Sequence, residues 1–203
     1  MVALTARRAG KLSAWLVTVI VAGYSSVAIG QIDPSVSEFF SRVAQAVSTL
    51  AGKTGKDADS ACLALVQSLF DLDAFDHGTA GPVWDRMTAE QRTAYGAALE
   101  QRAVSNCVND NQKNTGITAS YLGVRATADG DRLLATRVGQ PNSTAGRTVI
   151  WRLSAKGPPE LRATDLLVDG RSTVLSLRDE VSALLQRNNG DIDAMIRGLG
   201  NSG

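Results

Sequence analysis

The sequence has little of what most active sites use. Its 203 residues include one histidine, His77, and two cysteines, Cys62 and Cys107. This scarcity excludes most metal sites and most histidine-based catalysis. Aromatic residues make up only 5%, which argues against a stacking platform for single-stranded nucleic acid. No nucleophile elbow, phosphate-binding glycine loop or dinucleotide fingerprint occurs, so neither enzymatic activity nor a cofactor is expected.

The charge of the chain is balanced and nowhere concentrated. There are 21 lysines and arginines against 20 aspartates and glutamates, with no basic block or stripe. Binding to nucleic acid or to an acidic membrane surface depends on such a stripe, so neither partner is expected. With 44% hydrophobic and 20% charged residues, the composition is typical of a folded globular protein, and the length predicts one domain or at most two.

Residues 1–30 have the three parts of a secretory signal peptide. Basic residues precede an apolar run over residues 12–22, and the small-residue pattern Ala-Ile-Gly ends at residue 30. Polar and small residues interrupt the apolar run, which disfavours the alternative of an uncleaved membrane anchor. We therefore expect an exported chain whose single domain spans residues 31–203.

Export would place Cys62 and Cys107 in an oxidising compartment. We expect one disulfide between them there, because closing so long a loop contributes about 4 kcal/mol when the geometry allows it. Two buried free thiols on helices are the alternative.

Hydrophobic periodicity predicts helices in the first and last parts of the mature chain. Apolar residues recur at helical spacing over residues 36–50 after an Asp-Pro start. A second helix is predicted over about 59–70, with residues 71–82 as loop or short helix. A capping box at residues 88–91 begins a long helix, and two more helices follow residue 170.

Between residues 117 and 168 the apolar period changes to two, which predicts four strands. The first has an irregularity near Gly123, and the fourth runs from Glu160 to Val168. Helices, antiparallel strands and helices again predict an α+β fold, in which helices pack around a curved, mainly antiparallel sheet of four to five strands. A gap between helices and sheet would be an apolar pocket, and a filled core is the alternative.

One short segment gathers polar side chains. His77 is flanked by Asp73 and Asp76, which would fit a small metal site or an acid/base cluster. We favour the interpretation that these residues cap short helices in an exposed connection. An enzyme or small-ligand binder that used all three would need a polar cavity around them.

Several arginines lie in or beside the predicted strands. We expect them to face solvent and to pair with aspartate and glutamate rather than to recognise an anion. They are Arg147, Arg152, Arg162 and Arg171.

Four blocks of sequence carry a family resemblance. They are residues 70–73 (FDLD), 84–95 (WDRMTAEQRTAY), 165–174 (DLLVDGRSTV) and 190–196 (GDIDAMI). In order and spacing they resemble the MlaC-type phospholipid-binding proteins, also called the toluene-tolerance or ABC-transporter auxiliary family. The resemblance extends over about residues 36–200.

This resemblance implies a periplasmic lipid carrier of a Gram-negative envelope. Members like this hold phospholipid tails in a pocket between a mixed sheet and surrounding helices, and they do no bond chemistry on the lipid. They exchange lipid with an inner-membrane ABC transporter complex and an outer-membrane lipoprotein complex. The related HpnM branch implies a hopanoid as an alternative ligand, and a non-transport envelope binding protein is a further alternative. We expect the chain to act as a monomer.

Lipid contacts are expected from apolar side chains where the sheet faces the helices, although each could instead belong to ordinary core packing. Where many relatives carry aromatic residues in the long helix, this chain has Ser105, Asn106 and Cys107, so pocket size and lipid preference do not follow from the resemblance. The predicted lining residues are Val138, Val149, Trp151, Leu153, Leu166, Val168, Val174, Leu177 and Leu185.

Overall fold

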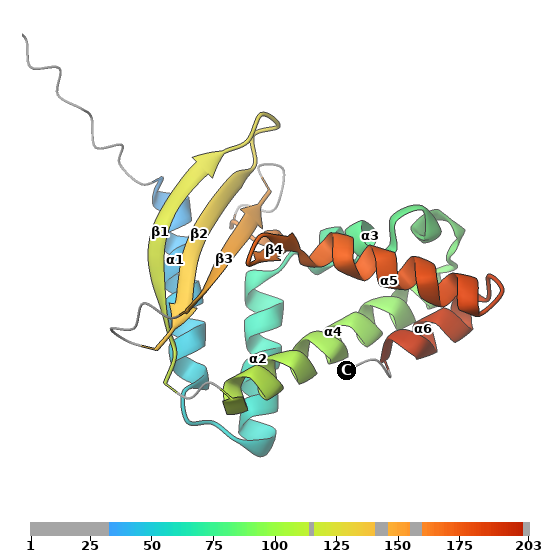
Figure 1. Cartoon of the computed structure of the whole chain (residues 1–203), viewed down its shortest axis with the longest axis horizontal. Coiled ribbons are helices and arrows are strands. Elements are labelled where there is room, and N and C mark those ends of the chain that lie inside the picture. The colour runs from blue at the N-terminus through green and yellow to red at the C-terminus, as the bar shows by residue number, and fades with distance from the viewer. Residues whose placement is uncertain (1–32, 114–115, 141–145, 155–159, 201–203) are drawn as a thin grey trace, which may run out of the picture. The chain divides into compact units, whose positions relative to one another are not determined.

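The chain divides into two units, Met1–Gln31 and Ile32–Gly203. The predicted signal peptide, residues 1–30, falls in the first unit and lies outside the described residues. Among the described residues of the second unit, six α-helices, one 3-10 helix and a five-stranded sheet that does not close confirm the predicted α+β class (Figure 1). The computed structural model describes residues 33–113, 116–140, 146–154 and 160–200.

The elements follow one another as helices, strands and helices. The helices are α1 (Pro34–Leu50), α2 (Gly55–Leu69), α3 (Leu72–Ala80), the 3-10 helix η1 (Gly81–Arg86), α4 (Ala89–Lys113), α5 (Thr173–Arg187) and α6 (Ile192–Gly200). The strands are β1 (Thr118–Ala126), β2 (Arg132–Gly139), β3 (Gly146–Leu153), β4 (Ala163–Val168) and β5 (Arg171–Ser172). Among the described residues, none of these helices combines the length and hydropathy that a membrane crossing requires.

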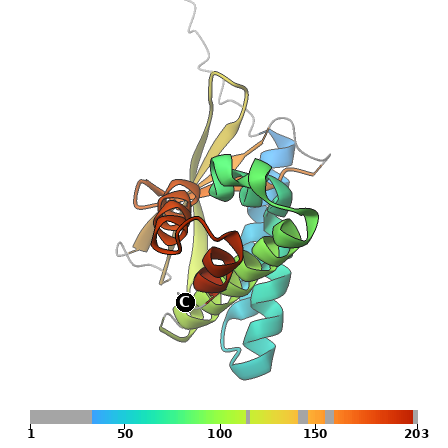
Figure 2. The same ribbon diagram turned by 90° about the vertical axis from the view of Figure 1, so that its right-hand side faces the viewer.

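Helix α1 forms where its apolar spacing predicts. The Asp33 carboxylate accepts a hydrogen bond from the Ser35 backbone N–H at 3.0 Å, and proline occupies the first turn. The apolar face packs on the sheet, and α2 lies beside α1 in Figure 2. The buried residues of α1 are Val36, Phe39, Val43, Val47 and Leu50.

The sheet is antiparallel throughout, in the order β1-β2-β3-β4-β5. Trp151 lies opposite Leu134 and opposite Leu166, so these side chains share the face that α1 covers. The indole Nε1–H donates to the Thr136 hydroxyl at 3.0 Å, which satisfies a polar pair inside the core. The register shifts between Tyr121 and Gly123, which confirms the predicted irregularity.

Several predicted boundaries differ from the structure. Helix α2 begins at Gly55 rather than near residue 59, because its first turn is polar and exposed and so adds nothing to the apolar pattern. Of the two alternatives for residues 71–82, the short helix is correct over residues 72–80, where the Asp71 carboxylate accepts a hydrogen bond from the Ala74 N–H at 3.1 Å. Strand β4 begins at Ala163 instead of residue 160.

A turn with Asp169 and Gly170 in the left-handed region joins β4 to the short strand β5. The Asp165 carboxylate of β4 links this turn to the start of α5. It accepts hydrogen bonds from the backbone N–H of Val174 at 3.0 Å and from the Ser172 hydroxyl at 2.6 Å. Ser172 in turn caps α5. Asp165 therefore fixes the start of α5 on the sheet.

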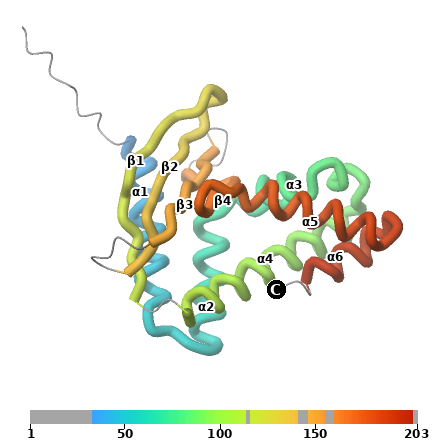
Figure 3. The backbone as a smooth tube through the Cα atoms, viewed as in Figure 1, coloured from blue at the N-terminus to red at the C-terminus, as the bar shows by residue number. Residues whose placement is uncertain are grey.

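In Figure 3, α5 then runs alongside α3, and α6 packs against α4. Two glycines permit close approach between elements. At Gly96 of α4, an added Cβ would lie 2.5 Å from an oxygen of Asp76 on α3. At Gly198 of α6, it would lie 2.7 Å from Leu184 of α5.

We predict that Asp165→Asn lowers the free energy of unfolding by about 1–2 kcal/mol, because one of the two acceptor oxygens is replaced by a donor. Urea unfolding measures the change. The matched control is Asp169→Asn, whose exposed pairing with Arg147 at 3.9 Å contributes less than about 0.5 kcal/mol. Equal losses in the two variants would contradict the role given to Asp165.

Candidate functional site

The buried apolar side chains form two clusters rather than one. The first, here the sheet core, joins α1 and the end of α2 to the sheet and includes Phe39 and Trp151. The second, here the helix core, joins α4, α5, α6 and η1 and includes Tyr95 and Met195. Phe75 of α3 packs against both cores.

A cavity of about 240 Å³, here the inner cavity, lies between the two cores. Its walls come from α2, α3, α4 and β4 and from the first residue of α5. Three of its side chains are strongly polar, namely Asp76, Glu100 and Asn106. Most of the rest are apolar and include Leu65, Val66, Phe70, Leu72, Phe75 and Leu99.

A second cavity of about 380 Å³, here the outer cavity, is more open to solvent and lies between α4 and α5. It adds Arg102, Arg171 and Glu180 to a wall of apolar and hydroxyl side chains. The two cavities adjoin, because five residues line both, and the pair is here called the hollow. Small-molecule sites have volumes of roughly 300–1,000 Å³. The residues that line both are Phe75, Leu99, Ala103, Asn106 and Thr173.

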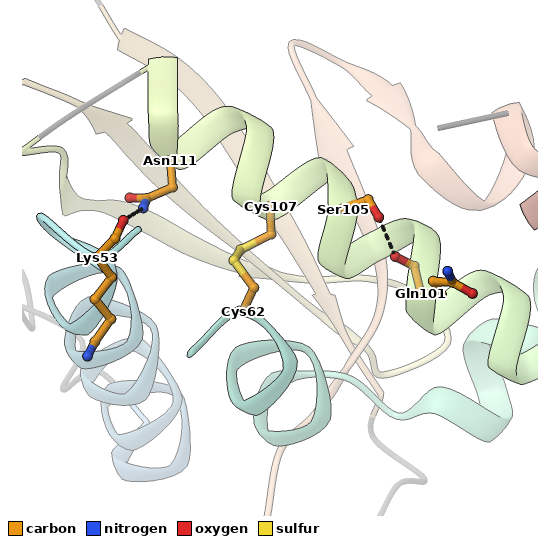
Figure 4. Close-up of a disulfide and its surroundings, with 6 residues drawn as sticks. All are labelled: Lys53, Cys62, Gln101, Ser105, Cys107 and Asn111. Atoms are coloured by element: carbon orange, nitrogen blue, oxygen red, sulfur yellow. Dashed lines mark hydrogen bonds between the residues drawn. A yellow bond between two sulfur atoms is a disulfide. The ribbon is translucent and has the colours of Figure 1, made fainter. Parts of the chain in front are cut away.

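A disulfide between Cys62 and Cys107 joins α2 to α4 at one side of the hollow (Figure 4). The S–S distance is 2.07 Å, and 45 residues separate the two cysteines along the chain. One turn beyond Cys107, the Asn111 amide donates to the Lys53 carbonyl at 3.1 Å. Since Cys107 also lines the inner cavity, this covalent link is part of the cavity wall.

Polar links join the other walls of the hollow. Arg102 of α4 pairs with Glu180 of α5 at 2.8 Å. Arg178 of α5 donates to the Gly78 carbonyl of α3 at 2.9 Å. The Asp71 N–H donates to the Ala163 carbonyl of β4 at 3.0 Å. With the disulfide and Asp165, these links connect every element that borders the hollow.

Of the nine residues predicted to contact lipid, three line the hollow. Leu166 of β4 borders the inner cavity, and Val168 and Leu177 border the outer cavity.

Four of the other six lie in or against the two cores, and Val138 and Val174 belong to neither core. Trp151 makes ring contacts with Phe39 at 5.6 Å and Phe70 at 6.0 Å, and Phe70 lines the inner cavity, so Trp151 supports the wall from behind. For these six, ligand contact stays a prediction. They are Val138 (half-buried), Val149, Trp151 and Leu153 on the sheet, and Val174 and Leu185 on α5.

Most of the lining comes from α2, α3 and α4, which sequence reasoning did not assign to a pocket. The one available signal was small or short side chains on the inward face of α4. Ala103 and Cys107 lie four residues apart on that face, and Leu99 lies one turn before them. Small residues at such positions leave space where leucine or phenylalanine would fill it.

Asp76 is the lining residue whose electrostatics differ most from those of a surface group. Burial, with smaller contributions from the negative charges of Asp73 and Glu100, raises its pKa from 3.8 to about 7. Asp76 is therefore much more readily protonated near neutral pH than a surface aspartate, and an uncharged carboxyl group fits an apolar wall far better than a carboxylate.

The side chains of Asp73, Asp76 and His77, which the sequence suggested as a metal site or acid/base cluster, do not come together at one site. Asp73 and His77 are exposed, and the imidazole packs edge-on against Trp84 at 5.7 Å. Only Asp76 of the three reaches the hollow. Within the described parts of the chain, no three histidine, cysteine or acidic side chains come together as metal ligands.

The strand arginines are placed differently from one another. Arg147 and Arg152 pair with aspartates, as expected, and Arg152 reaches Asp131 at 2.7 Å. Arg162 instead donates to the Gln67 carbonyl at the end of α2, at 3.1 Å. Arg171 departs from the expectation, since it forms no ion pair with any described residue.

Comparison with known proteins agrees with this architecture. The family model described as MlaC protein matches residues 36–201. A solved phospholipid-binding protein from Ralstonia solanacearum, in complex with a phospholipid, is similar in fold at 16% sequence identity, with a TM-score of 0.65 over 82% of this chain and 93% of that chain. No curated protein matches the sequence.

We predict that replacing Cys62 and Cys107 together by alanine lowers the free energy of unfolding by about 2–4 kcal/mol, because the unfolded chain is then no longer cross-linked. Urea unfolding with and without reductant measures this. Reductant should destabilise the parent and leave the double variant unchanged. Labelling of two free thiols in unreduced, denatured parent protein would contradict the disulfide.

We predict that Asp76→Asn makes stability less dependent on pH. A carboxyl group with a pKa of about 7 when folded and 3.8 when unfolded holds its proton more tightly in the folded state, so stability is lost as pH rises from about 4 through 7. The variant should gain about 1 kcal/mol over the parent at pH 8, after allowance for solvent screening, and little at pH 4. Thermal unfolding of the exposed control Asp179→Asn should follow the parent at each pH. A constant difference between Asp76→Asn and the parent would contradict this assignment.

Proposed function

The chain belongs to the MlaC protein family, and on that premise we propose that it is a lipid carrier that binds phospholipid tails in the hollow between its two cores. The observation that carries this proposal is a largely apolar inner cavity that shares five lining residues with a more polar, more open outer cavity. A phospholipid has the same division, with apolar chains joined to a polar head group. The similar Ralstonia solanacearum protein, solved with a phospholipid, supports the same ligand class.

The energetics favour a lipid tail as the ligand. Each methylene moved from water into an apolar site contributes about 0.8 kcal/mol, so ten methylenes contribute about 8 kcal/mol before the entropic cost of binding. We assign the tail contacts to Phe75, Leu99 and Leu166, together with Val168 and Leu177 towards the outer cavity.

The carrier role extends to where the protein works and with what. We propose that it acts in the periplasm after removal of residues 1–30, and that it shuttles lipid as a monomer between an inner-membrane ABC transporter complex and an outer-membrane lipoprotein complex. Free lipid tails cannot cross an aqueous gap without a dry container, and the hollow supplies one. This role needs binding and release but no catalytic group, so we do not propose an enzyme.

The proposal is tested by the lipid content of the purified protein. Organic extraction followed by mass spectrometry should find phospholipid in near-stoichiometric amount, and stripped protein should take up phospholipid from vesicles. Protein that is free of lipid after purification, and that takes up none from vesicles, would overturn the proposal.

We predict that Ala103→Trp lowers lipid content at least fivefold, because Ala103 lines both cavities and an indole there occupies the space between them. Ala94→Trp is the matched control, since Ala94 is an exposed residue of the same helix and should leave lipid content unchanged. Circular dichroism checks that both variants fold. Full lipid content in folded Ala103→Trp would contradict binding in this hollow.

A further inference from the structure

The two parts of the hollow carry charges of opposite sign. Among the described residues, the ionisable side chains that line the inner cavity are both acidic, namely Asp76 and Glu100. The outer cavity has Arg102, Arg171 and Glu180, which leaves it with a net positive charge. A ligand that spans both cavities therefore meets acidic groups around its deeper part and an excess of positive charge near solvent.

Arg171 supplies that excess charge. Arg102 is matched by Glu180 at 2.8 Å, and both side chains are largely buried. Arg171 projects from the two-residue strand β5 as an exposed side chain and has no ion-pair partner among the described residues. A guanidinium group in this position is free to make two parallel hydrogen bonds to an oxyanion.

The start of α5 does not compete for that oxyanion, although it also borders the hollow at Thr173. The N–H groups of Val174 and Leu175 in its first turn are already bound. The Asp165 carboxylate accepts from Val174, and the Ser172 hydroxyl accepts from Leu175 at 3.1 Å. Side chains are therefore the main candidates to hold an anion at the outer cavity, and Arg171 is the cation there that has no ion-pair partner in the described part of the chain.

Building on the proposed function, we propose that Arg171 is a specificity-determining residue that binds the phosphodiester of a glycerophospholipid at the outer cavity while the acyl chains occupy the inner cavity. The opposite orientation would place the phosphate beside Asp76 and Glu100, where like charges repel it. Asp76 tolerates acyl chains because burial already raises its pKa to about 7, so that it is readily protonated beside an apolar ligand.

The experiment compares two lipids that share their tails and differ in the phosphate. Full-length protein stripped of lipid receives equal amounts of dioleoylphosphatidylglycerol and dioleoylglycerol from cyclodextrin, and mass spectrometry measures the ratio of the two lipids bound. The parent should favour the phospholipid. Arg171→Met should lower that ratio about five- to tenfold, which is typical of one charge-assisted contact near solvent, and Arg171→Lys should lower it less.

Two further variants sharpen the test. Arg125→Met removes an exposed arginine of β1 and should leave the ratio as in the parent. Glu180→Gln frees Arg102 from its pair and should raise the ratio about two- to threefold. Higher salt should reduce the preference of the parent and have little effect on Arg171→Met.

The outcomes separate this inference from the function on which it rests. Failure of the parent to bind either lipid would overturn the carrier function itself. Uptake of both lipids with the same ratio in the parent and in Arg171→Met would overturn only the role of Arg171. Preferred uptake by the parent of an uncharged hopanoid, diplopterol, over the phospholipid would also overturn the role of Arg171. Displacement of bound phospholipid by 10 mM inorganic phosphate would overturn it too, because it would identify a site for free phosphate.

Discussion

The separation of the apolar side chains into two cores is the constraint on which the rest of the structure depends. Phe75 packs against both cores, and the hollow lies where they would otherwise merge. A single core would close-pack and leave no room for a ligand. The elements around the hollow are tied at their margins, by the Cys62–Cys107 disulfide and the Arg102–Glu180 pair among others.

The inner and outer parts of the hollow differ in charge. Its inner part is apolar with a carboxyl group that loses its charge easily, and its outer part has an unpaired arginine. A carrier has to release its ligand as well as hold it. A site that is dry at one end and wet at the other lets the polar end of a lipid remain in contact with water, so that only the tails must be transferred between binding sites.

The sequence predicted the helices, the antiparallel strands and the α+β class because each depends on local periodicity and turn residues. The sequence also predicted that Val149, Trp151 and Leu153 share one face of the sheet, since successive side chains of a strand point to opposite faces. Alternation does not show which helix covers that face. Helix α1 does so around Trp151, whereas the hollow borders the neighbouring strand β4 at Leu166, directly opposite Trp151. Its α4 wall was not assigned, because Leu99, Ala103 and Cys107 have the helical spacing of an ordinary core face, and that spacing does not show whether neighbouring side chains fill the space beside them.

The central claim is that an acyl chain lies between the two cores, and the most direct measurement is a crystal structure with a phospholipid brominated along its tails. Anomalous scattering locates the bromine atoms independently of the protein density. The two-core account predicts bromine peaks inside the inner cavity, near Phe75, Leu99 and Ala103. Peaks on the outer surface of the sheet, or none within the protein, would contradict it.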